Sequence, residues 1–265
     1  MFTTAHLALY SPTGTSLQIG KTFTTALGIE NCTVVDATHE AVGDMVIEDF
    51  AIFVVPVYAG RVAAVAKERL AGLRGNNTPA VIIVVYGNRN YDDALVELED
   101  MVKEAGFIPM AAAACIAEHS YSSESKPIAL GRPDSADERA LDGFAGAVRI
   151  KFGGGDYSIP DIPGNRPYRD GVGFAPFHPI AGTNCTLCGE CVAVCPTEAI
   201  HLGETGPLWQ DGRCTLCCAC IKSCPTDNLQ FEEQAFLEIA DMLYKNCKNR
   251  REPEFFLGVN PTSGL

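Results

Sequence analysis

The 265-residue sequence lacks any apolar run of the roughly 18 residues that a membrane-spanning helix requires, so no membrane span is expected. Its first ten residues, MFTTAHLALY, have no basic segment ahead of the apolar run, so we expect no signal peptide and a cytoplasmic location. Basic residues are scarce: the sequence has 20 Lys and Arg but 33 Asp and Glu, which gives a net charge of −13. This balance argues against binding to a nucleic-acid backbone. It is compatible with docking to basic patches on partner proteins, although plain soluble proteins often share it.

Two nucleotide-binding motifs are also missing. The stretch LYSPTGTSLQIGKTF (9–23) contains Gly-Lys-Thr, but the motif G-x-x-x-x-G-K-[ST] needs a glycine where Thr15 stands. The spacing matters because the loop must wrap a phosphate that the lysine can reach, and Lys21 would instead lie about two turns inside a helix. No G-x-G-x-x-G follows the first strand-like run. These absences argue against an ATP-binding loop and against direct oxidation of a nicotinamide cofactor.

Cysteine, by contrast, is abundant, with 12 residues that lie mostly within 185–224. Disulfides would suit a secreted chain, but the close spacing and the expected absence of a signal peptide favour metal ligation. An internal repeat with an offset of 29 residues covers 184–230, and each copy contains C-x2-C-x2-C-x3-C-P. This is the run of bacterial ferredoxins with two [4Fe–4S] clusters, and it is more specific than the paired C-x2-C knuckles typical of zinc sites.

The spacing assigns the ligands. Three cysteines at i, i+3 and i+6 can hold three corners of a cubane, whereas the fourth lies too far along the chain and crosses to the other cluster. One cluster is therefore predicted on Cys185, Cys188, Cys191 and Cys224, and the other on Cys214, Cys217, Cys220 and Cys195. Cys218 is extra and is predicted not to be a ligand, although the motif leaves an exchange of ligands open. Cys32 and Cys115 are expected to be buried apolar residues, and Cys247 has no evident partner.

The first 150 residues alternate apolar, β-branched runs with segments of helical periodicity. Strands are expected over 5–10, 32–37, 49–58, 79–87 and 107–116, and helices over 15–27, 61–73, 91–105 and 134–151. Five strands separated by helices predict an α/β doubly wound fold, with an open parallel sheet covered on both faces. The length favours the flavodoxin-like strand order 2-1-3-4-5 over a dinucleotide-binding fold, which usually has six strands.

The loop between the first strand and the first helix is rich in hydroxyl groups. Four of its side chains can donate to phosphate oxygens, a glycine permits a tight turn, and the helix N-terminus adds N–H donors. The candidate phosphate-binding residues are Ser11, Thr13, Gly14, Thr15 and Ser16. They follow the pattern [ST]-x-T-G-x-[ST], and here the sequence resembles the flavodoxins, whose FMN phosphate loop has this pattern. A plain hydroxyl-rich helix cap is the alternative.

Two further loops should emerge beside this one, because ligands of open parallel sheets bind outside the carboxyl ends of the strands. They are PVYAGR (56–61) and YGNRNY (86–91). The resemblance to flavodoxins implies that both flank the isoalloxazine ring of FMN, with Tyr58 and Tyr91 as aromatic faces. Each tyrosine taken alone is more often a packing residue, and Arg89 could equally be an exposed surface residue. The predicted FMN-binding residues of these loops are Pro56, Tyr58, Ala59, Gly60, Gly87, Asn88, Arg89 and Tyr91.

A long polar loop (118–133) follows the fifth strand, and long loops on rigid scaffolds often carry function. Glu118, His119 and Tyr121 should lie at the same sheet edge, near the flavin or at a domain contact.

Composition divides the chain into four parts. We expect a flavodoxin-like FMN-binding domain over 1–151, a linker rich in Gly and Pro over 152–183, a small α+β ferredoxin-like domain with two [4Fe–4S] clusters over 184–230, and a helix and tail over 231–265. The aromatic residues of the linker predict an ordered segment rather than a flexible tether. The tail after the amphipathic stretch 231–247 shows no pattern.

Over nearly its whole length the chain resembles the fused flavodoxin–ferredoxin proteins of anaerobes, sometimes called ferrodoxins. The resemblance implies electron transfer between FMN and two [4Fe–4S] clusters in anaerobic metabolism, with redox partners of the ferredoxin, flavodoxin or oxidoreductase type, and it is compatible with a homodimer. Two alternatives stay open. The chain could reduce a small substrate at the flavin, with His119 or Tyr121 as proton donor, or it could be a redox-dependent binding module. An electron carrier is favoured over a substrate-specific enzyme.

Overall fold

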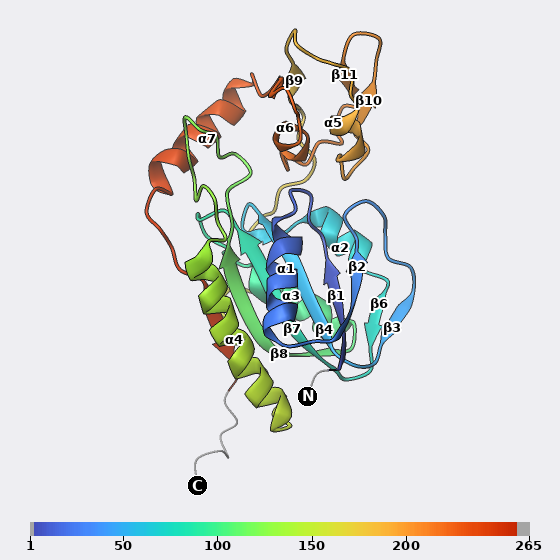
Figure 1. Ribbon diagram of the computed structural model, residues 1–265, viewed down its shortest axis with the longest axis vertical. Helices are drawn as coiled ribbons and strands as arrows, with labels where there is room; N and C mark the ends of the chain where they lie inside the picture. Colours follow the sequence, from blue (N-terminus) through green and yellow to red (C-terminus); the bar gives the residue numbers. More distant parts are fainter. Residues whose placement is uncertain (1–2, 259–265) are drawn as a thin grey trace.

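The computed structural model describes residues 3–258, and its main body is a sheet of strand order β13-β8-β7-β4-β1-β2 (Figure 1). Five of these strands pair in parallel: β1 (Thr4–Leu9), β2 (Asn31–Asp36), β4 (Ala51–Tyr58), β7 (Thr78–Tyr86) and β8 (Phe107–Ile116). Counted along the chain, they have the order 2-1-3-4-5. The flavodoxin-like doubly wound fold is therefore confirmed.

Helices cover both faces of the sheet. One face packs on α1 (Thr15–Ala26) and α4 (Ser135–Gly153), and the other on α2 (Ala64–Leu70) and α3 (Ala94–Glu104). The central strand β7 shows why its sequence is a continuous apolar run. Ile83 packs with the first pair of helices and Ile82 with the second, and both are fully buried. A strand covered on both faces has no position left for a polar side chain.

The C-terminal tail adds a strand that its sequence did not predict. β13 (Glu254–Leu257) pairs antiparallel with β8 at the sheet edge. Phe255 lies opposite Ala113, and Phe256 lies opposite Ala112, so the small residues of β8 leave room for two rings. The Phe255 ring stacks on Phe144 of α4 with their centroids 4.7 Å apart. The strand is only four residues long, which is too short for a periodic signal.

The helix predicted over 61–73 is shorter than expected, because short strands flank it. These are β5 (Arg61–Val62), which folds back on β4, and β6 (Leu73–Gly75), which pairs with β3 (Met45–Ile47).

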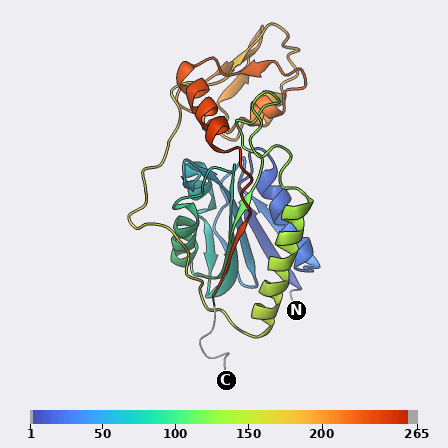
Figure 2. The same cartoon turned by 90° about the vertical axis from the view of Figure 1, so that its left-hand side faces the viewer.

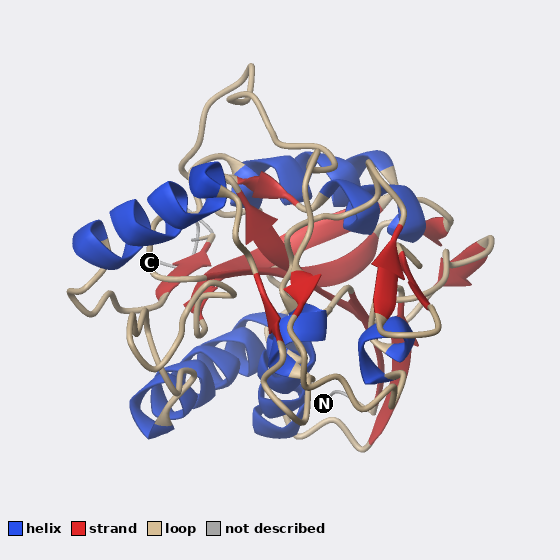
Figure 3. Cartoon of the chain, turned by 90° about the horizontal axis from the view of Figure 1, so that it is seen from above, coloured by secondary structure: helices blue, strands red, loops and turns tan. Residues whose placement is uncertain are grey.

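The cysteine-rich unit lies above the carboxyl ends of the parallel strands (Figures 1 and 3). It contains two short helices, α5 (Glu190–Ala193) and α6 (Ala219–Lys222), and two small antiparallel pairs: β10 (Ile200–Leu202) with β11 (Pro207–Trp209), and β9 (Ile180–Ala181) with β12 (Leu229–Gln230). The amphipathic helix α7 (Gln234–Asn246) follows. From its end the chain runs back down to β13 (Figure 1). No helix within residues 3–258 combines the length and apolar character needed to cross a membrane.

The linker climbs from the end of α4 to the cysteine-rich unit along the outside of the domain (Figure 2). It is tied to α3: Arg166 forms an ion pair with Asp100 at 2.7 Å, and the backbone N–H of Asn165 donates to Asp93 at 2.8 Å. The Arg61 guanidinium lies over the ring of Tyr168, 4.7 Å from its centroid. These contacts describe an ordered segment.

The edge strand supports a stability prediction. Phe255→Ala removes a half-buried ring stacked on α4 and should lower the free energy of unfolding by about 2 kcal/mol. Leu257→Ala, on the same strand but exposed, should change it by less than about 0.5 kcal/mol. Urea unfolding followed by circular dichroism measures both. Equal effects would show that β13 does not stabilise the sheet edge through this stack.

Candidate cofactor sites at the carboxyl edge of the sheet

Four cysteines that the spacing assigned to one cluster line a single cavity. Cys195, Cys214, Cys217 and Cys220, the inner cysteine set, border this space together with Pro196. The pKa of Cys220 is raised by burial and then by the Cys217, Cys214, Cys195 and Cys191 thiols. Within residues 3–258, no three Cys, His, Asp or Glu side chains are grouped as around a single metal ion. Four thiols that border one space are the donor set that a [4Fe–4S] cluster uses.

The backbone repeats the symmetry of the sequence. Left-handed φ values occur at Leu187 and Leu216, at Gly189 and Cys218, and at Glu198 and Asp227, pairs separated by the same 29 residues as the cysteine runs. The fourth cysteine of each run accepts a backbone N–H at 3.3 Å, Cys195 from Ala199 and Cys224 from Asn228. A donated N–H stabilises a thiolate, which is the form that binds metal.

The other set is more exposed. Cys185, Cys188, Cys191 and Cys224 form the outer cysteine set, in which Cys188 is exposed and Cys191 is buried. Burial and then the Cys185 and Cys188 thiols raise the pKa of Cys191. Cys224 packs against the same apolar cluster as Cys191. That cluster also contains Cys195 and Cys220 of the inner set, so the two cysteine sets adjoin one apolar core.

Cys218 occupies the position that is Gly189 in the first repeat, with φ of 59° against 81°. Although it also borders the inner cavity, its thiol donates to the Leu216 carbonyl at 3.6 Å and packs with Phe231 and Phe236. These contacts suit a buried apolar residue, and its exclusion from the ligands stays a prediction.

The hydroxyl-rich loop keeps donors available for an anion. Ser11 is already engaged, since its hydroxyl accepts the Leu17 N–H at 3.0 Å and its own N–H donates to Thr38 at 2.9 Å. Ser16 is fully buried at the first turn of α1, and its hydroxyl has no hydrogen-bond partner among the residues described. Gly14 caps the helix with φ of 81° and open space where a Cβ would stand. A phosphate would supply the acceptor that the Ser16 hydroxyl lacks.

The second loop is a tight hairpin rather than an open loop. β5 folds back on β4, pairing Tyr58 with Arg61, and the two residues between them, Ala59 and Gly60, both have left-handed φ. Pro56 lies within β4 and pairs with β7. The hairpin holds the half-buried Tyr58 at the strand tip.

The third loop is largely engaged by other parts of the chain. Gly87 allows the His119 ring to lie so close that a Cβ would be 2.4 Å from it. Arg89 forms an ion pair with Asp92. Tyr91 is 6% exposed, its ring packs on Tyr86 with centroids 5.5 Å apart, and its hydroxyl donates to Glu254 at 2.9 Å. Its stacking on a flavin stays a prediction, and the packing role is the one these contacts describe.

The inner cysteine set influences two tyrosines at the tips of the parallel strands. Burial and then Cys217 raise the pKa of Tyr58 well above its ordinary value, and Cys218 and Tyr121 contribute. Burial and then Cys217 also raise the pKa of Tyr10, the residue after β1. The Cys217 thiol is therefore one of the groups that act on the pKa values of the tyrosines at the tips of β1 and β4.

The loop after β8 forms much of this contact. Glu118 pairs with Lys222 of α6 at 2.7 Å, and Lys126 pairs with Asp241 of α7. The ring of Tyr121 contacts that of Phe236 of α7, with centroids 4.6 Å apart. His119 lies behind Tyr121 and accepts its backbone N–H at Nδ1, at 3.0 Å.

Arg69 on α2 is a contact residue that the sequence did not reveal. Its guanidinium donates to the carbonyl of Pro196, directly after Cys195, at 2.6 Å, and also to the carbonyl of Thr38. A lone arginine on an amphipathic helix carries no signal of such a role.

Comparisons with known proteins find similarity in two separate stretches of the chain. Residues 182–201, which contain the first cysteine run, match the family described as 4Fe-4S binding domain. No curated protein matches the chain. Part of the chain resembles a short-chain flavodoxin associated with a non-canonical PDU bacterial microcompartment, with 15% identity, coverage of 57% of this chain and 99% of that one, and a TM-score of 0.40. The Streptococcus pneumonia TIGR4 flavodoxin has 17% identity, coverage of 56% of this chain and 99% of that one, and a TM-score of 0.39. The Fusobacterium nucleatum flavodoxin bound to flavin mononucleotide has 10% identity, coverage of 56% of this chain and 98% of that one, and a TM-score of 0.36. At such identities and scores, the fold assignment rests on the strand order of the sheet itself.

The environment of His119 leads to a pH prediction. Burial, with the charges of Lys222 and Arg89, lowers its pKa to about 4, below the ordinary value of about 6.5. The unfolded chain therefore binds the proton first, and the stability that neutral His119 contributes is lost as the pH falls from about 6.5 to 4. Protonation at Nδ1 would also break the bond from the Tyr121 N–H. Nitrogen-15 NMR of labelled histidine, assigned with His119→Gln, should show a ring that stays neutral at pH 5.5. Titration near pH 6.5 would contradict this environment.

Proposed function

We propose that this chain is an electron-transfer protein that carries FMN at the carboxyl edge of its sheet and two [4Fe–4S] clusters in its cysteine-rich unit, and that electrons pass between these groups and redox partner proteins. When bound, FMN supplies one- or two-electron chemistry and each cluster supplies one-electron chemistry. The inner and outer cysteine sets would hold the clusters. The loops 11–16, 56–61 and 86–91 would hold FMN.

One observation carries the proposal: Arg69 of α2 donates to the Pro196 carbonyl, directly after Cys195 of the inner set, at 2.6 Å, which places this set at the carboxyl edge of the sheet. Joining two redox sites in one chain replaces diffusion by a fixed effective concentration, which helps only if the sites are held close together. The Arg69–Pro196 and Glu118–Lys222 contacts hold them close from two sides of the interface.

Aromatic side chains shield the inner set. Phe231 and Phe236 stack with centroids 3.7 Å apart beside Cys218, and Phe177 and Tyr121 pack against the same cluster. This cover excludes water from the side of the inner cavity that faces α7. A dry, apolar surrounding is one of the means by which a protein sets the potential of an iron–sulfur site.

The outer set offers the exchange point with a partner. Cys188 is exposed, and the neighbouring Leu187 is 41% exposed. Two exposed acidic residues lie near proposed ligands in the chain: Glu190 directly precedes Cys191, and Asp227 is three residues after Cys224. A small apolar contact with acidic neighbours suits a redox partner that carries basic residues around its own centre. The exposure of this set also favours an anaerobic setting inside the cell.

Reduction of a small substrate at the flavin receives less support. His119 is neutral at pH 7, its Nδ1 already accepts a backbone N–H, and Tyr121 packs on α7. Both of the proton donors considered for such a reaction are therefore committed to the domain contact.

Anaerobic purification with quantitation of iron, sulfide and flavin tests the proposal. We expect about eight iron atoms and one FMN per chain, with a redox titration that resolves flavin from clusters. Cys217→Ser should reduce the iron to about four atoms, because it removes a ligand of the inner set.

Cys218→Gly is the matched control for that variant, because glycine accepts the left-handed φ of 59° and Cys218 is not assigned as a ligand. It should keep the full iron content. Zinc without flavin in the parent protein would overturn the proposal, whereas iron loss in Cys218→Gly would overturn only the ligand assignment.

A further inference from the structure

The last described part of the chain is an extended segment that returns to the flavodoxin-like domain. Residues 247–258, the C-terminal arm, begin at the end of α7 and include β13 (Figure 2). At the far end of the arm, the buried Lys151 ammonium donates to the Gly258 carbonyl at 2.6 Å and to Ser158 of the linker at 2.7 Å. The arm is thus a second connection between the two parts of the chain, besides the linker.

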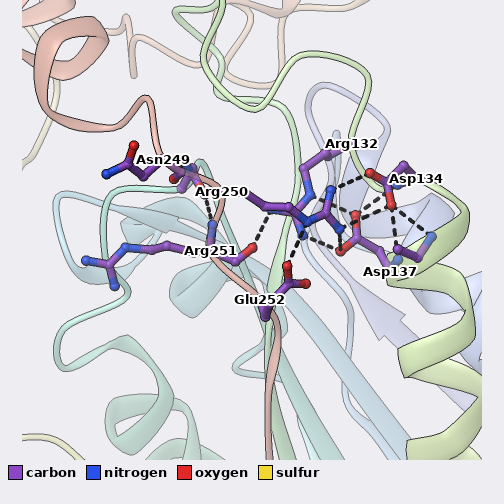
Figure 4. A network of polar contacts seen from close by, with 9 residues as sticks. Arg132, Asp134, Asp137, Asn249, Arg250, Arg251 and Glu252 are labelled. Carbon is purple, nitrogen blue, oxygen red and sulfur yellow. Dashed lines mark hydrogen bonds and ion pairs between the residues drawn. The ribbon is translucent and has the colours of Figure 1, made fainter.

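Charged groups at the start of α4 hold the middle of the arm (Figure 4). Arg132 and Asp137 form a buried ion pair, and Arg132 also donates to the Arg251 carbonyl at 2.6 Å. Arg250 reaches Asp134, the capping residue of α4, at 2.5 Å. The arm is therefore bound to the start of α4 at two neighbouring residues, by a carbonyl that accepts from a buried arginine and by a partly exposed ion pair.

The start of the arm binds the third loop through one side chain. The amide of Asn88 donates to the carbonyls of Cys247 and Asn249 at 2.8 and 2.9 Å, and its oxygen accepts the Arg251 N–H at 3.1 Å. Asn88 is 3% exposed, so these bonds are shielded from solvent. All of its amide hydrogens are used, and none is left to contact a cofactor directly.

These bonds matter for the shape of the loop. Asn88 has φ of 63° and Asp92 has φ of 42°, so the loop adopts a conformation that L-residues rarely favour. Such a conformation persists only where its surroundings hold it. Here the surroundings are the arm on one side and the His119 ring against Gly87 on the other.

We propose that the C-terminal arm is part of the cofactor site, and that Asn88 is a positioning residue through which the arm holds the third loop in the shape that binds FMN. The inference rests on the proposed function. It reassigns Asn88 from a direct contact of the flavin to the connection between flavin loop and arm. Because the arm continues from α7, which packs on the cysteine-rich unit, the same connection joins the flavin loop to that unit.

The test compares two asparagines in the cluster-loaded protein. Asn88→Gly removes the amide while glycine accepts the left-handed φ, and it should raise the dissociation constant for FMN about tenfold, as expected for lost buried hydrogen bonds. Asn77→Gly makes the same change at an exposed residue with φ of 54°, in the turn before β7, and should leave that constant unchanged. Quenching of FMN fluorescence measures both.

Hydrogen exchange gives a second readout that needs no variant. In the parent protein, FMN should slow the exchange of the Arg251 N–H, which donates to Asn88, as well as the exchange of loop 11–16. Protection of loop 11–16 without any change in the arm, together with an unchanged dissociation constant in Asn88→Gly, would overturn the inference and leave the proposed function standing. A raised dissociation constant in Asn88→Gly, together with no slowing of hydrogen exchange in the arm of the parent protein, would indicate that Asn88 contacts the flavin directly. That result would also overturn the inference. A parent protein that binds no FMN would overturn both.

Discussion

All five parallel strands end at one edge of the sheet, and every proposed role of this chain depends on what is gathered there. A parallel sheet delivers its loops to that edge because each strand is followed by a crossover to the other end. Three loops lie at this edge: loop 11–16 before α1, the hairpin of Tyr58 and the loop of Asn88. The cysteine-rich unit lies directly above them (Figure 1). Proximity of the two kinds of site is thus a consequence of topology.

The unit stays in place because contacts from separate elements reach it. Arg69 of α2 binds the Pro196 carbonyl, the loop after β8 supplies Glu118 and Tyr121, and the C-terminal arm returns from α7 to the sheet. Single surface ion pairs contribute little stability, but several contacts on one unit restrict its orientation. The arm also links the unit to the sheet directly, because its last part, β13, pairs with β8. Because Asn88 binds the start of the arm, movement of the unit would also move the loop 86–91.

The features that the sequence predicts best are those set by local spacing. The cysteine runs predict which four thiols border one cavity, and β-branched runs such as the one in β7 reveal strands buried on both faces. The sequence could not predict the contacts of the arm. The pairing of Glu254–Leu257 with β8, and the hydrogen bonds from Asn88 to the arm, join residues more than a hundred positions apart. Long-range contacts also account for the packing of Tyr91, whose ring packs on Tyr86 and whose hydroxyl donates to Glu254. A loop motif indicates where a side chain emerges, and long-range packing decides what it touches.

The central claim is that the inner cysteine set and the flavin loops form one continuous redox region. A crystal structure of the anaerobically purified protein tests it most directly. The account predicts an iron–sulfur cluster bound by Cys195, Cys214, Cys217 and Cys220, with FMN beside Tyr58 on the same side of the interface. A flavin bound away from this edge, or clusters separated from it by solvent, would contradict the account.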